Sequence, residues 1–264
     1  MSRDRLARVF LVAATVVASG LVGAVRPAAA HFQEILPSED VLAEGGRVTV
    51  DLVFTHPMER GPVMEMARPK RVGAVVGGKT VDLGPTLSEQ SHDGKRTWRF
   101  ERDIRAPGAS VLFVEPQPYW EAAEKKWIVH HAKVVVDGFA SGEGWDASTG
   151  APVEIEPLVR PTGLWTGNLF RGLVRRQGEP VPFAEIEVEW VNDGSVTVPN
   201  EAFLTQVIKA GPDGSFAYAM PRAGWWGFAA LVDGPEAPGP DGKPAKTEVG
   251  GLMWVKATDM GAAK

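Results

Sequence analysis

Short alternations of apolar and polar residues, separated by turn signals, constrain the fold of this chain most strongly. In the run Arg47–Phe54 every second residue is apolar, so that one face is hydrophobic, which is the pattern of a half-buried β-strand. Four similar runs follow before residue 140: Arg71–Val76, Thr97–Asp103, Ser110–Glu115 and Trp127–Asp137. Short strands divided by Gly- and Pro-containing turns predict an all-β fold built from β-sandwiches. Only Glu121–Lys126 suggests a helical turn.

The second half of the chain has a different residue pattern. Prolines punctuate Ala151–Arg160, which is typical of a connecting strand or linker, and the Pro- and Gly-rich stretch Asp233–Glu248 predicts an exposed hairpin between the last two strands. Residues 172–188 read G-x-V-x-x-x-G-x-P-V-P-x-A-x-I-x-V, and a D-G-S-F turn follows at Asp213–Phe216. This part resembles β-sandwich domains of the transthyretin-like, carboxypeptidase-regulatory type, which are usually structural or adhesive modules.

The first 30 residues have the three parts of a secretory signal peptide. Three arginines lie within the first eight residues, Val9–Val25 is apolar, and Ala28-Ala29-Ala30 supplies the small residues of a cleavage site. The apolar stretch falls short of the roughly 20 strongly apolar residues of a spanning helix. We therefore expect a periplasmic mature protein that begins at His31. The predicted organisation is a signal peptide (1–30), an N-terminal metal-binding β-sandwich (31–155) and a C-terminal transthyretin-like, immunoglobulin-like β-sandwich (156–264).

Charge and composition exclude several function classes. The full chain has 28 basic and 33 acidic residues; without the four Arg and one Asp of residues 1–30, the net charge is about −8. This excess of negative charge disfavours nucleic acid and anionic membranes as partners. The chain has no Cys, so disulfides and thiolate ligands are excluded. It also lacks a Gly-rich phosphate loop, a G-x-S-x-G motif and an H-E-x-x-H motif, and we expect no enzyme.

Histidine is the most informative residue type, because there are five and all precede residue 132. Cleavage after Ala30 would give His31 both a free α-amine and an imidazole. The amine nitrogen and Nδ1 can then chelate one metal ion in a closed ring. The amine titrates near about 8 and the imidazole near about 6.5, so a metal can displace protons from both at neutral pH. Amine and imidazole nitrogens suit Ni²⁺ and Co²⁺, and also Cu²⁺ and Zn²⁺.

The other histidines differ in how well their sequence positions suit metal binding. His56 directly follows the strand that ends at Phe54, at a strand-to-loop position where binding residues are frequent. His130 and His131 are neighbours within one predicted strand, so they face opposite sides and at most one is expected at a given site. His92 adjoins an Asp-Gly turn and is expected to be exposed. We predict that His31, His56 and either His130 or His131 hold one ion.

Several segments of the mature chain occur in a characteristic order: His31-Phe32-Gln33, Phe54–Met66, Trp120-Glu121, Gly144-Trp145-Asp146 and Leu164–Asn168. Together they resemble the soluble periplasmic component associated with cobalt and nickel uptake systems, a family catalogued as a domain of unknown function. The resemblance implies capture of Ni²⁺ or Co²⁺, as a bare ion or a small chelate, and delivery to a membrane permease. It does not identify which histidines bind.

Two other readings compete with metal uptake. In one, the chain is a structural or adhesive pair of sandwiches whose histidines are incidental. In the other, it is a copper-binding protein or a copper-dependent oxidase, because an N-terminal His with a second His also describes the copper site of oxidative polysaccharide-cleaving enzymes. In the metal-uptake reading, carboxylates such as Glu59, Glu65 or Asp146, or water, complete the coordination of the ion.

Overall fold

The computed structural model describes residues 31–261, and the predicted signal peptide lies outside them. Within this range nearly all regular structure is β-strand, and the other regular elements are two single 3₁₀ turns, η1 (Gly84–Thr86) and η2 (Glu201–Phe203). The all-β prediction is confirmed. No helix in the described part of the chain is long and apolar enough to cross a membrane.

The strands form three sheets. The first has the order β1 (Phe32–Pro37), β3 (Gly46–Thr55), β7 (Lys95–Ile104), β6 (Ser88–His92). The second, central sheet has 12 strands, eight of them in the order β16 (Gln206–Lys209), β15 (Glu185–Trp190), β18 (Gly224–Asp233), β20 (Pro244–Thr258), β10 (Lys126–Gly138), β8 (Gly108–Glu115), β4 (Arg71–Val76), β5 (Lys79–Asp82). Four short strands complete it: β2 (Val41–Leu42), β9 (Tyr119–Glu121), β12 (Leu164–Trp165) and β19 (Ala237–Pro238). The third sheet contains β11 (Val153–Pro157), β13 (Leu169–Arg176), β14 (Glu179–Pro180) and β17 (Ser215–Ala219).

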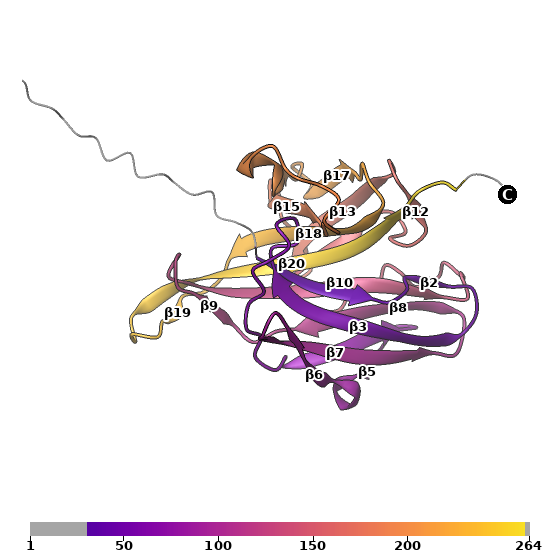
Figure 1. Ribbon diagram of the computed structural model, residues 1–264, viewed down its shortest axis with the longest axis horizontal. Helices are drawn as coiled ribbons and strands as arrows, with labels where there is room; N and C mark the ends of the chain where they lie inside the picture. The colour runs from indigo at the N-terminus through magenta and orange to yellow at the C-terminus, as the bar shows by residue number, and fades with distance from the viewer. Residues whose placement is uncertain (1–30, 262–264) are drawn as a thin grey trace, which may run out of the picture.

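The central sheet lies between the other two sheets, as Figure 1 shows, with β3 and β7 on one side and β13 and β17 on the other. Consecutive residues of its long strands therefore enter different cores. Along β20, Leu252 and Trp254 belong to the core beneath the first sheet, whereas Met253 and Val255 belong to the core beneath the third. Strands with both faces buried read as continuous apolar runs. The two predicted sandwiches thus share their middle layer.

The proposed division of the chain after residue 155 stays a prediction. Strands from the two sides of that point form one continuous central sheet and meet where β20 pairs in parallel with β10, from Lys126 opposite Lys246 to Val134 opposite Trp254. The C-terminal strand also contributes the fully buried Trp254 to the N-terminal core. The two units are therefore joined through backbone hydrogen bonds as well as through packing.

Strand positions agree closely with the sequence patterns. The run Arg71–Val76 is β4 with the same bounds, and the predicted strand Trp127–Asp137 is one residue longer at each end. The stretch after Asp233 is a hairpin, in which β18 and β20 pair antiparallel. The suggested helical turn at Glu121–Lys126 is wrong: Glu121 pairs with Lys126, so these residues close the β9–β10 hairpin.

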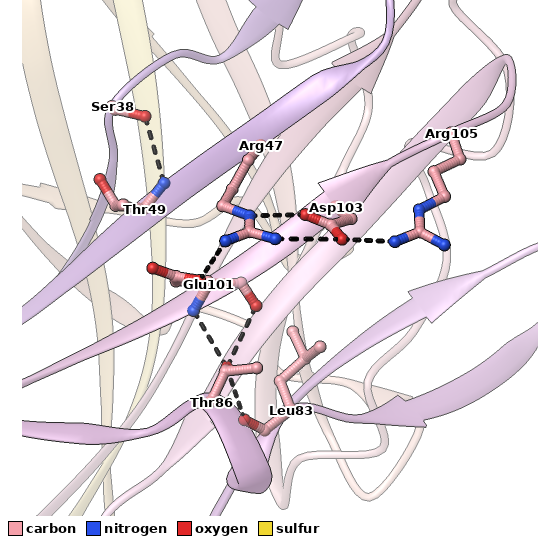
Figure 2. Close-up of polar contacts among 8 residues, drawn as sticks. All are labelled: Ser38, Arg47, Thr49, Leu83, Thr86, Glu101, Asp103 and Arg105. Carbon is pink, nitrogen blue, oxygen red and sulfur yellow. Dashed lines mark hydrogen bonds and ion pairs between the residues drawn. The ribbon is translucent and has the colours of Figure 1, made fainter.

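Ion pairs cover the solvent face of the first sheet. Figure 2 shows Arg47 of β3 against Asp103 and Glu101 of β7, with Arg105 on the far side of Asp103. The Arg47 side chain is 59% exposed. Pairs this exposed contribute at most about 1 kcal/mol each, so the buried face of the sheet supplies most of its stability.

Candidate metal site

Antiparallel pairing of β1 and β3 brings His31 and His56 together. Phe32 lies opposite Thr55 at the end of this pairing, so His31 directly before β1 and His56 directly after β3 are neighbours. Residues directly opposite on antiparallel strands project to the same face. The two imidazole rings accordingly lie 4.5 Å apart between centroids, at an interplanar angle of 54°.

The two rings are set in an aromatic and largely dry environment. His31 lies 5.5 Å from the Phe54 ring and 5.9 Å from the Tyr119 ring, both measured between centroids. Its side chain is 10% exposed, and His56 is 6% exposed. Burial, and to a smaller extent the neighbouring His56, lower the pKa of His31 to about 4 against the opposing effect of Glu121. His31 is therefore neutral at physiological pH, as a metal ligand must be.

The loop after His56 is docked against the C-terminal half of the chain. The backbone N–H of Met58 donates to Glu189 Oε2 (3.0 Å), and the Asn192 side chain donates to the Met58 carbonyl (3.1 Å). The backbone N–H of Asn192 donates to the carbonyl of Pro57 (3.2 Å). These bonds attach the loop to β15 and the segment behind it, so both halves of the protein position His56.

His130, on β10, contacts the backbone of His31. Its Nδ1 lies 2.7 Å from the His31 carbonyl oxygen, and its Nε2 lies 3.0 Å from Glu248 Oε1. Both partners are hydrogen-bond acceptors, so a ring that satisfies both carries a hydrogen on each nitrogen. Burial would raise the pKa of Glu248, but the hydrogen bonds and charges of His130 and Lys126 lower it to about 2. In this arrangement His130 anchors the start of β1, and neither ring nitrogen is open to a metal.

Gly250 makes room for this anchor. It lies opposite His130 in the β10–β20 pair, and a Cβ at this position would be 2.5 Å from His130 Cδ2. The flat strand surface left by glycine lets the ring lie across β20 and reach Glu248. A glycine within a strand pattern is the sequence signal that could have indicated a close approach here.

His131 and His92 do not join the cluster. His131 occupies the opposite face of the central sheet, in a groove lined by Trp127, Val129 and Val249. Burial is the largest influence on His131 and lowers its pKa. His92 is exposed at the end of β6, as expected. Of the two alternatives His130 and His131, the structure brings only His130 to His31.

The carboxylates near the cluster are Glu121 and Glu248 rather than those suggested by sequence. Glu65, one of the suggested residues, pairs with Arg96 on the surface. Among residues 31–261, no three His, Asp or Glu side chains form a group that could hold a metal ion. The predicted ligand set remains a prediction, because it also includes the α-amine nitrogen that cleavage before His31 would create.

Solved structures similar to this chain are distant from it. PorU from Porphyromonas gingivalis is 13% identical, with 87% of this chain and 20% of that chain covered and a TM-score of 0.22. Escherichia coli alpha-2-macroglobulin is 9% identical, with 86% and 20% covered and a TM-score of 0.23. The titin Ig tandem domains are 12% identical, with 88% and 97% covered and a TM-score of 0.18.

These scores carry no argument about function, and the chain spans about a fifth of the length of the first two proteins. Among curated proteins, none matches this chain. A family does match, over residues 28–234, which include both strands of the histidine pair and the anchor strand β10. The chain belongs to this family, which is described as "Domain of unknown function (DUF4198)".

Proposed function

We propose that the mature protein captures a divalent transition-metal ion, Ni²⁺ or Co²⁺, in the periplasm and delivers it to a membrane uptake system. The observation that carries the proposal is the buried pair of imidazole rings, His31 and His56, 4.5 Å apart. Burying two imidazole rings side by side is costly unless their nitrogens serve a ligand or hydrogen bonds. Imidazole nitrogen is a preferred donor for Ni²⁺, Co²⁺, Cu²⁺ and Zn²⁺.

The α-amine of His31 would complete three nitrogen donors. In the precursor this nitrogen belongs to a peptide bond, where its lone pair is delocalised and binds metals poorly. Signal-peptide cleavage turns it into an amine that forms a chelate ring with Nδ1 of the same residue. The His130 anchor on the His31 carbonyl supports this arrangement, because it immobilises the backbone next to the amine. Pre-organised donors lower the entropic cost of binding.

Three nitrogens leave coordination positions for water or for a small chelator that arrives with the ion. A tetragonal arrangement of nitrogen and oxygen ligands suits Ni²⁺ and also Cu²⁺. Because Cu²⁺ binds any such site more tightly in vitro, the physiological metal is decided by elemental analysis of protein isolated from the periplasm. Copper as the sole metal in that sample would replace nickel and cobalt in the proposal.

The decisive test compares two N-termini. A chain beginning at His31 is expected to bind Ni²⁺ or Co²⁺ at least tenfold more tightly than a chain with one additional Ala before His31, a difference of about 1.4 kcal/mol or more in calorimetric titration. The two circular dichroism spectra should coincide. Equal affinities of the two chains would refute the terminal-amine chelate.

Side-chain replacement tests the second ligand. His56→Ala should weaken binding at least tenfold, because the second imidazole lies beside His31. His92→Ala is the matched control, since His92 is exposed and remote from the pair. Equal losses in both variants would mean that the titration reports nonspecific surface binding.

A further inference from the structure

Two nitrogens of the His31 ring are potential metal donors, and the structure distinguishes them. Nε2 lies 2.9 Å from Glu121 Oε2, and both side chains are largely buried, at 10% and 13% exposure. We propose that Glu121 is a positioning residue, which accepts the Nε2–H of His31 and so presents Nδ1 to the metal. This assignment rests on the proposed function, and it adds a residue that contacts no metal itself.

The Glu121 carboxylate is held in place by its own hairpin. Its second oxygen, Oε1, accepts the backbone N–H of Ala123 at 2.8 Å. Glu121 also pairs across the hairpin with Lys126, at the beginning of the strand that carries His130. The acceptor for His31 is thus fixed to the same strand as the anchor for the His31 carbonyl.

The chemistry of the contact decides which nitrogen carries the hydrogen. A carboxylate oxygen only accepts, so the ring nitrogen facing it must be the N–H. The remaining lone pair of the neutral ring then lies on Nδ1. Nδ1 is also the nitrogen next to the side-chain carbon, and it alone can close a ring with the α-amine of the same residue. Carboxylate partners of metal-bound histidines fix the ring in this way and increase its basicity.

Other roles for Glu121 make different predictions. If the metal bound His31 through Nε2, Glu121 would occupy the metal's position, and removing it would strengthen binding or leave it unchanged. If Glu121 were itself a ligand, its hydrogen bond to His31 would be lost when the metal arrives. Nitrogen-15 NMR of the His31 ring separates these cases, with Zn²⁺ as a diamagnetic probe.

The experiment uses protein beginning at His31, with and without Zn²⁺. Without metal, we expect a hydrogen-bonded, slowly exchanging proton on Nε2 in the wild type and its loss in Glu121→Ala. With Zn²⁺, we expect the coordination shift at Nδ1 while Nε2 keeps its proton. Glu121→Ala should weaken Zn²⁺ binding about 10- to 100-fold. Glu121→Gln retains an acceptor oxygen and should recover part of this loss.

Glu124→Ala is the matched control, because Glu124 lies in the same hairpin and pairs with Lys126 instead of His31. It should leave both the Nε2 proton and the Zn²⁺ affinity unchanged. Wild-type protein that binds Zn²⁺ through Nε2, or a Glu121→Ala variant that binds as tightly as wild type, would overturn the assignment and leave the proposed function intact. Wild-type protein that binds no Zn²⁺, Ni²⁺ or Co²⁺ would overturn the proposed function itself.

Discussion

Glu34 makes the stability of this protein depend on pH in a direction that can be measured. It lies in β1, is 7% exposed, and faces two other acidic residues, Glu189 of β15 and Asp51 of β3. Burial, with a smaller contribution from these two charges, raises the pKa of Glu34 from 4.5 to about 8. A carboxyl with a raised pKa keeps its proton in the native state while the unfolded chain has already lost it. Native stability therefore falls as pH rises from about 4.5 to about 8.

The magnitude follows from the size of the shift. Each unit of pKa difference corresponds to about 1.4 kcal/mol, so the full shift corresponds to about 5 kcal/mol across this pH range. Glu34→Gln removes the titrating group and keeps nearly the same volume. We expect the variant to be close to wild type at pH 5 and more stable by several kcal/mol at pH 9.

Urea unfolding at pH 5, 7 and 9 measures this difference. Both proteins retain Glu189, whose pKa is raised to about 7 chiefly by burial, so its contribution largely cancels in the comparison. Glu39→Gln is the control, because Glu39 is exposed in the segment after β1 and should show no pH-dependent gain. A stability difference between Glu34→Gln and wild type that stays constant from pH 5 to pH 9 would refute the reasoning.

Three further changes test the architecture around the site. Gly250→Ala should displace the His130 ring, since the new Cβ would lie 2.5 Å from it. This variant keeps the histidine at position 130 but should still weaken Ni²⁺ binding in calorimetric titration. Trp254→Ala should cost about 3–5 kcal/mol in urea unfolding, because Trp254 is fully buried and its Nε1–H donates to the Gln33 carbonyl at 2.9 Å. His131→Ala should leave Ni²⁺ affinity unchanged, because His131 lies on the other face of the sheet; a loss comparable to that of His56→Ala would place the metal elsewhere.

Local patterns in the sequence determined where the strands are. The period-2 alternation of Arg47–Phe54 and the continuous run of apolar and Gly residues within Arg71–Val76 depend only on neighbouring residues, and both runs are strands in the structure. The hairpin after Asp233 is equally local, because Gly and Pro mark its turn. Histidine scarcity and the predicted cleavage site together identified His31 and His56 as candidates worth attention.

Tertiary structure alone decided which of these elements meet. The parallel pairing of β10 with β20 joins residues about 120 apart in the sequence, and no local pattern specifies such a partner. The same pairing determines that His130, and not His131, faces His31, although alternation already required the two to point apart. Glu121 and Glu248 have no distinguishing spacing, so only the folded chain shows that they contact His31 and His130. Strand formation depends on short-range periodicity in the sequence. Which strands pair with each other depends on burying apolar faces contributed by the whole chain. The histidine cluster is formed by this long-range strand pairing.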